Sequence, residues 1–188
     1  MGKFFRGIFV LLAIIAAPKS WAQDSPNLNS DINVHYQQLK KAFNKLDVSL
    51  IAPLYSENAC YLPEGQSKAI IIGKEKILDL HRNFFSRIRA KRARIEVDFR
   101  VIDRQLNKQK ATDVGYFLVR FYPAPETGEP TSEFAGKFVS VLEQSEDGKW
   151  HLTVDSSHKA DPSLYFSAKP VDKLYYGELF SPLNQEKE

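Results

Sequence analysis

The residues with the clearest chemical potential lie near the C-terminal end, in the predicted strand 149–158. Four polar side chains at alternate positions share one face of that strand: His151, Thr153, Asp155 and Ser157. Asp155 is the candidate general base or anchoring acceptor, because burial among apolar groups raises the pKa of a carboxyl. The alternative is a structural ion pair, for which Arg120 is the candidate partner.

Other candidates are spread along the chain. His81, in a predicted helix, is the second candidate acid–base residue. The candidate ligand-binding residues are aromatic or polar side chains: Tyr36, Tyr55, Tyr61, Phe84, Phe99, Tyr116, Arg120, Phe138, Thr153 and Ser157. Aromatic side chains at helical or strand spacing also fill protein cores, so both interpretations stay open for each of them. The histidines and the single cysteine, Cys60, show no metal-ligand spacing, and we expect no metal and no cofactor.

Residues 1–22 have the pattern of a secretory signal peptide. A short basic segment with Lys3 and Arg6 precedes an apolar run over residues 8–17, and Ser20 and Ala22 place small side chains at a cleavage site. We therefore expect an exported protein, either periplasmic or secreted. The apolar run is shorter than the roughly 20 residues that span a bilayer, so we expect no stable membrane insertion after cleavage.

Removal of this segment changes the charge of the working protein. Of the 26 Lys and Arg residues, Lys3, Arg6 and Lys19 lie in the segment with no acid, which leaves 23 bases against the 23 Asp and Glu. The remaining chain is neutral, and acids interrupt the basic stretch 82–104. We therefore expect no nucleic-acid partner.

The hydrophobic pattern predicts an α+β domain over 31–160, after a flexible lead-in at 23–30. Apolar side chains recur at helical spacing in 31–46, in a short segment at 48–54, and again in 77–88. Short strands are predicted at 59–62 and 69–72. Alternation of period two then predicts four long strands, at 95–101, 114–122, 134–143 and 149–158, paired as an antiparallel meander.

A C-terminal extension, 161–188, follows this domain. Its tail, 169–188, carries an apolar cluster made up of Leu174, Tyr175, Tyr176, Leu179 and Phe180. They predict packing on the domain's own surface, with exchange into a second subunit as the alternative.

Three segments in this order resemble SnoaL-like and ketosteroid-isomerase-like members of the nuclear-transport-factor-like superfamily. They are LYSENACYLPEG (54–65), GKEKILDLHRNFF (73–85) and DGKWHLTVDSS (147–157). The resemblance implies three N-terminal helices packed on a strongly curved, mainly antiparallel sheet, a cone-shaped α+β barrel. It also implies an apolar pocket in the cone, with the face that carries Asp155 turned into it.

The same resemblance argues against steroid isomerisation. The positions of the isomerase tyrosine, base and second acid fall on Leu39, Pro63 (beside Glu64) and Gly136, none of which supplies the required group. Fold alone does not decide function. We therefore expect a small-molecule-binding domain for an apolar or amphipathic ligand. A cofactor-independent isomerase, cyclase or hydrolase that uses Asp155 or His81 is the alternative.

A third hypothesis is a non-enzymatic dimerisation or assembly module. The apolar outer face of the sheet would form a homodimer through the following residues: Trp150, Leu152, Val154, Ala135, Val139 and Val141. Homodimerisation is compatible with ligand binding, so this hypothesis can hold together with the first.

Overall fold

The structure, a computed structural model, describes residues 28–65 and 68–183. The predicted signal peptide therefore lies outside the described residues. The helices are α1 (Leu28–Lys45), α2 (Lys74–Ala90) and α3 (Pro162–Ser167), with single 3₁₀ turns η1 (Val48–Leu50), η2 (Ala52–Leu54) and η3 (Pro125–Thr127). The strands are β1 (Tyr55–Leu62), β2 (Ile71–Ile72), β3 (Arg94–Asn107), β4 (Lys110–Tyr122), β5 (Ser132–Gln144) and β6 (Trp150–Ala160).

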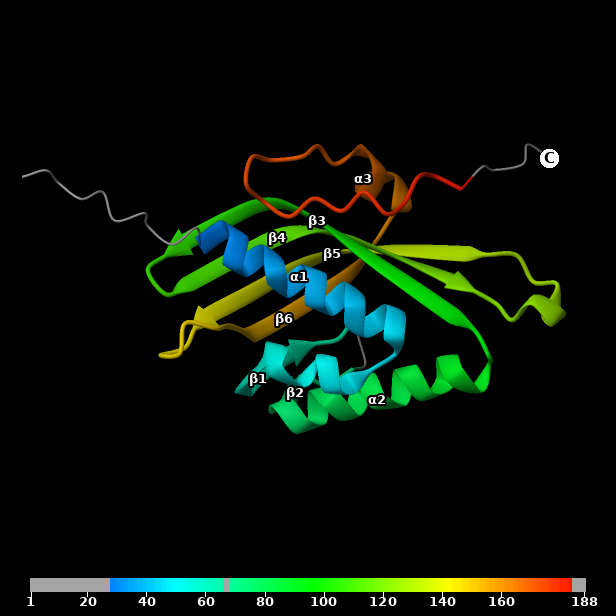
Figure 1. Ribbon diagram of the computed structural model, residues 1–188, viewed down its shortest axis with the longest axis horizontal. Coiled ribbons are helices and arrows are strands. Elements are labelled where there is room, and N and C mark those ends of the chain that lie inside the picture. Colours follow the sequence, from blue (N-terminus) through cyan, green and yellow to red (C-terminus); the bar gives the residue numbers. More distant parts are fainter. Residues whose placement is uncertain (1–27, 66–67, 184–188) are drawn as a thin grey trace, which may run out of the picture.

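The six strands form one open sheet in the order β2-β1-β6-β5-β4-β3 (Figure 1). The four long strands pair sequentially and antiparallel, as predicted, whereas β1 joins β6 in parallel. The sheet is neither closed nor strongly curled, which corrects the expectation of a cone-shaped barrel. The physical reason is that the edge strand β2 has only two residues and cannot pair with β3 at the opposite edge.

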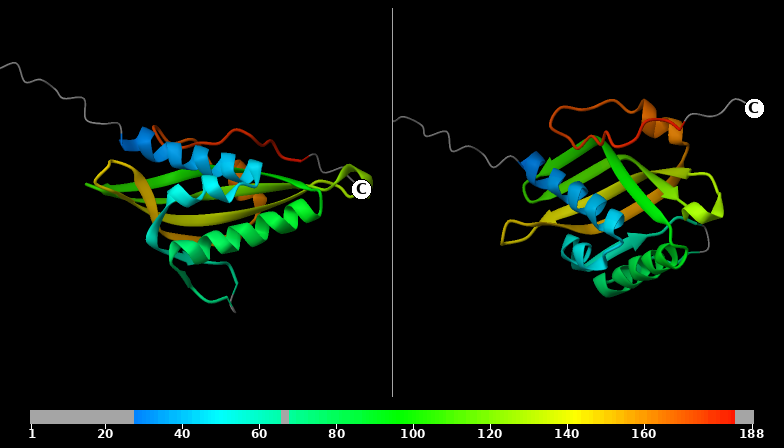
Figure 2. Two further views of the ribbon diagram at one scale, coloured as in Figure 1. Left: turned by 60° about the horizontal axis from the view of Figure 1, so that its bottom comes forward. Right: turned by 45° about the vertical axis from the view of Figure 1, so that its right-hand side comes forward.

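Helices α1 and α2 cover the inner face of the sheet, as Figures 1 and 2 show. Both are amphipathic, and their apolar stripes include Ile32 and Leu39 in α1 and Ile77 and Phe85 in α2, all in the main core. The predicted second helix is instead the pair of 3₁₀ turns. Asp47 caps the first of them by accepting a hydrogen bond from the Ser49 amide at 2.9 Å.

The C-terminal segment 161–183 lies against the outer face and along the β3 edge (Figures 1 and 2, orange to red). It therefore packs on the surface of its own domain. Arg100 of β3 is held between the rings of Tyr165 and Tyr176, 4.2 and 4.4 Å from their centroids. Its guanidinium also donates to the Tyr165 carbonyl oxygen at 2.6 Å.

A close approach of backbone fixes the same segment. At Gly177 a Cβ atom would lie 2.2 Å from the Asp98 carboxyl group, so only glycine fits without a shift. Asp98 is fully buried and accepts hydrogen bonds from the Leu179 amide and the Tyr175 hydroxyl. These bonds satisfy a charge that burial would otherwise make costly.

The outer face is less apolar than the sequence predicts. Trp150 and Leu152 point inward and belong to the main core, and the C-terminal segment covers Ala135. Only the three valines of the expected set, Val139, Val141 and Val154, remain half-buried or exposed. Homodimerisation through this face stays a prediction.

No helix in the described parts of the chain combines the length and the apolar character needed to cross a membrane.

Candidate functional site

A β-bulge in β6 determines which side chains enter the site. On β5, Val141 and Leu142 are adjacent, but their partners on β6 are Val154 and Leu152, so Thr153 is an extra residue outside the ladder. Its hydroxyl donates to the Val141 carbonyl oxygen at 3.2 Å. The bulge places both Leu152 and Asp155 on the inner face, although strict alternation would put them on opposite faces.

The inner face of the sheet, α1 and α2 enclose a cavity of about 610 Å³. Nine of the predicted site residues line it: Tyr36, Tyr55, Tyr61, Phe84, Phe99, Phe138, His81, Asp155 and Ser157. Its deep end is formed by fully or almost fully buried residues, including Tyr36, Tyr55 and Leu152. Its mouth is marked by lining residues that are exposed to solvent, among them Arg87 and Phe134.

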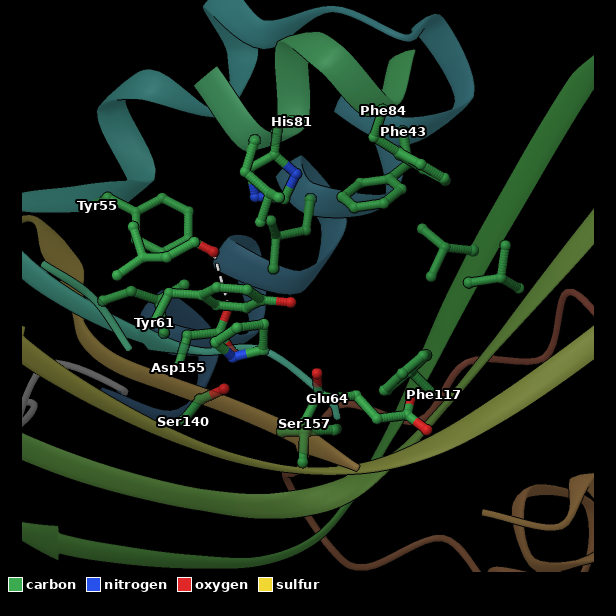
Figure 3. Close-up of a pocket in the computed structure, with 18 of the residues that line it drawn as sticks. Phe43, Tyr55, Tyr61, Glu64, His81, Phe84, Phe117, Ser140, Asp155 and Ser157 are labelled. Atoms are coloured by element: carbon green, nitrogen blue, oxygen red, sulfur yellow. Dashed lines mark hydrogen bonds between the residues drawn. The ribbon is translucent and has the colours of Figure 1, made fainter. Parts of the chain in front are cut away.

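Asp155 is the carboxylate at the deep end (Figure 3). The Tyr55 hydroxyl donates to its Oδ2 at 2.7 Å. Burial raises the pKa of Asp155 to about 6, against a smaller lowering by this hydrogen bond. Asp155 is half-buried and lines the cavity. The proposed partner Arg120 lies on the outer face and pairs with Glu133 at 3.0 Å, so the ion pair with Asp155 is excluded.

His81 reaches the cavity from α2, with its ring 6.2 Å from the ring of Tyr55 (Figure 3). Burial lowers its pKa to about 4, so the imidazole is neutral at pH 7. Its Nε2 is buried and has no hydrogen-bond partner in the described structure. A buried polar atom without a partner is costly to the folded state.

A row of polar side chains crosses the inner face behind Asp155. In the sheet register Arg104 faces Asp113, Asp113 faces Ser140, and Ser140 faces Asp155. The Arg104 guanidinium donates twice to Asp113, through Nε and Nη2 at 2.7 Å each, and both side chains are almost fully buried. This fork-shaped pairing fixes Asp113 rigidly.

Tyr36 connects this row to the cavity. Its hydroxyl donates to Asp113 Oδ2 at 2.6 Å, and burial together with the Asp113 charge raises its pKa well above the usual value. The hydroxyl proton of Tyr36 is therefore used in the hydrogen bond to Asp113. Its oxygen can only accept a hydrogen bond from a ligand. The neighbouring His35 is almost fully buried, and neither of its ring nitrogens has a hydrogen-bond partner among the described residues. Burial lowers its pKa to about 3.

The position expected for a second acid is filled by a ring. A Cβ atom at Gly136 would lie 2.3 Å from the Phe117 ring, so this glycine makes room for Phe117 in the cavity wall. Leu39, Pro63 and Glu64 do line the cavity, but Leu39 and Pro63 have no acidic or hydroxyl group. The site therefore lacks the constellation of a steroid isomerase.

Three predicted site residues lie outside the cavity lining. Tyr116 packs in the cluster on the outer face, Arg120 is paired there with Glu133, and Thr153 is the bulge residue. Strand β4 is apolar on both faces because the C-terminal segment covers its outer face. Alternation therefore could not show which parity faces inward.

Several lining residues were missed by the sequence analysis, notably Phe43, Phe117, Ser140, Leu152 and Arg87. Ser140 follows Phe138 at strand spacing and could have been found by extending that face. Among the described residues, no cluster of three or more His, Cys, Asp or Glu side chains is placed to hold a metal ion.

No protein-family profile and no curated protein matches the sequence. Solved structures do match its fold. A protein of Catenulispora acidiphila in complex with S-DNPA has a TM-score of 0.60 at 13% identity, covering 72% of this chain and 95% of that one. A ketosteroid isomerase-like protein of Erwinia carotovora atroseptica has a TM-score of 0.56 at 13% identity, covering 73% and 100%.

An NTF-2 like protein of unknown function from Shewanella oneidensis MR-1 has a TM-score of 0.54 at 18% identity. The alignment covers 70% of this chain and 98% of that protein. At these identities the similarity establishes the fold and not the activity. The chain has the NTF2-like fold, in agreement with the resemblance of its three sequence segments.

Proposed function

We propose that the exported, mature chain binds a small amphipathic molecule in the cavity. The observation that carries this proposal is a cavity of about 610 Å³ with aromatic walls that converge on the Asp155–Tyr55 pair. That volume lies within the range of small-molecule sites, which are mostly apolar with a few polar groups. A structural neighbour solved in complex with S-DNPA supports the proposal.

The polar groups at the deep end favour a hydrogen-bond donor on the ligand. Tyr36 and Tyr55 already donate their protons to carboxylates, so their oxygens and the free oxygen of Asp155 are acceptors. An apolar molecule with a hydroxyl or amino group would satisfy these acceptors while its body contacts the wall.

Thermal unfolding with N-phenyl-1-naphthylamine, a neutral aromatic amine, tests this proposal. At a ligand concentration of about 100 times Kd, binding stabilises the folded state by about 2.7 kcal/mol. For a chain of this size the melting temperature should rise by roughly 5–10 °C. Ser157→Trp fills the cavity and should abolish the rise, whereas Ser167→Ala, at an exposed position, should preserve it. If the probe raises the melting temperature of neither the native protein nor Ser167→Ala, the proposal is refuted.

A second candidate function is cofactor-independent proton transfer. The observation that favours it is the pKa of Asp155, about 6, which leaves a carboxylate at pH 7 close to its titration range. The carboxylate would take a proton from carbon beside a carbonyl group, the electron pair would move to the carbonyl oxygen, and the proton would return. His81 lines the same cavity, and its neutral imidazole would donate to that oxygen.

Exchange of the α-protons of 2-tetralone in deuterated water tests the second candidate. The protein should accelerate the exchange, and Asp155→Asn should abolish the acceleration while the protein stays folded. Equal exchange with the native protein and the variant excludes Asp155 as the base.

A further inference from the structure

The mouth of the cavity carries an arginine whose side chain has no partner among the described residues. Among the arginines in the described parts of the chain, every side chain except that of Arg87 has a hydrogen bond, an ion pair or a ring contact. Arg87 is exposed and lines the cavity. An unpaired guanidinium at the entrance of an apolar cavity is suited to bind a carboxylate, sulfonate or phosphate.

The other charged groups at the mouth are Lys68 and Glu64, both exposed and both in the lining. Counted over the described residues, the mouth therefore carries two cations against one acid. Asp155 lies at the deep end, away from these groups. Arg87 follows His81 by six residues on α2, which separates them by about 9 Å along the helix axis.

From this arrangement we propose that the ligand carries an anionic head group, which Arg87 binds at the mouth with Lys68 nearby. The apolar body lies between the aromatic walls, and the far end meets Asp155 and Tyr55. This inference rests on the proposed ligand-binding function and adds the chemical class of the ligand: an amphipathic anion with an apolar body about 9 Å or more in length.

Two fluorescent probes that differ by one sulfonate separate the inference from the function on which it rests. They are neutral N-phenyl-1-naphthylamine and anionic 8-anilinonaphthalene-1-sulfonate. Arg87→Met keeps the length of the side chain and removes its charge. It should weaken binding of the sulfonate about two- to fivefold, as expected for an exposed charge pair, and leave binding of the neutral probe unchanged.

Arg82→Met is the matched control, because it removes the same charge from the same helix outside the cavity lining. It should leave both affinities unchanged. Raising the salt concentration from about 0.05 to about 0.5 M should weaken binding of the sulfonate probe and leave binding of the neutral probe unchanged. An unchanged sulfonate affinity in Arg87→Met, or equal losses in both variants, overturns the inference. Failure of the neutral probe to bind instead refutes the cavity proposal itself.

Competition distinguishes the sources of the anion. If oleate displaces the bound sulfonate probe, the anionic group belongs to a free carboxylic acid. If phosphatidylglycerol vesicles displace it, the anionic group belongs to a lipid head group. Displacement by neither contradicts the proposed ligand class.

Discussion

Replacing Asp155 by asparagine should stabilise the protein at neutral pH. The cavity environment raises the pKa of this carboxyl from 3.8 to about 6. The folded state thus holds the proton more tightly than the unfolded state does, and this advantage is complete below about pH 4. It is lost as the pH rises through 6, and each pKa unit corresponds to about 1.4 kcal/mol. Above pH 7 the ionised carboxylate therefore costs up to about 3 kcal/mol.

The amide side chain introduced by Asp155→Asn would carry no charge at any pH, and its carbonyl oxygen can still accept the hydrogen bond from Tyr55. The variant should match the native protein near pH 4 and exceed it by up to about 3 kcal/mol near pH 8. Urea unfolding across this range measures the difference. Asp172→Asn, at a side chain that is 89% exposed, is the control. Its difference in free energy of unfolding from the native protein should not change with pH. The reasoning would be refuted if the difference for Asp155→Asn were also independent of pH, or if this variant were less stable than the native protein at pH 8.

Three further predictions concern buried groups. His35→Leu should reduce the loss of stability in acid, because the lowered pKa of this histidine, about 3, costs the folded state about 2 kcal/mol at pH 5. Urea unfolding at pH 7 and at pH 5 measures this loss in the native protein and the variant. Gly177→Ala should lower the free energy of unfolding by about 1–3 kcal/mol through its clash with Asp98, and limited proteolysis should show a loosened C-terminal segment. Tyr55→Phe should raise the pKa of Asp155 further, because it removes the hydrogen bond that lowers it; carbon NMR of the carboxyl group measures this.

Matched substitutions control the first two of these variants. His158→Gln, at an exposed histidine, should leave the acid destabilisation unchanged. Ser167→Ala, in the same C-terminal segment as Gly177, should leave the proteolysis pattern unchanged. A similar effect in a control and in its paired variant would contradict the structural explanation.

The elements of the fold were predictable because their patterns are local. The stripe of apolar residues in α1 and the alternation from Ile95 to Val101 both correspond to elements of the structure. The parallel pairing of β1 with β6 was not predictable, because it joins residues such as Tyr61 and Asp155 that are far apart in the sequence. The prediction of a cone-shaped barrel was wrong for a related reason. Closure of a sheet depends on whether its edge strands can pair, and local alternation does not show this.

The site was predicted in part, and the misses have physical causes. Asp155, Tyr55 and His81 were singled out by residue type and come together in the cavity. Arg120 was misplaced because the C-terminal segment makes the outer face of β4 as buried as its inner face. A strand buried on both sides gives no alternation from which to choose a face.

The extra residue at position 153 has a consequence for comparing this chain with others of its fold. An insertion in a strand would ordinarily turn every later side chain over, but here the ladder expels one residue and the rest keep their orientation. A homologous chain one residue shorter at this point would thus present the same acid to its interior. Alignments of such chains should place a gap at the bulge, because counting positions from the preceding turn would assign the carboxylate to the wrong side.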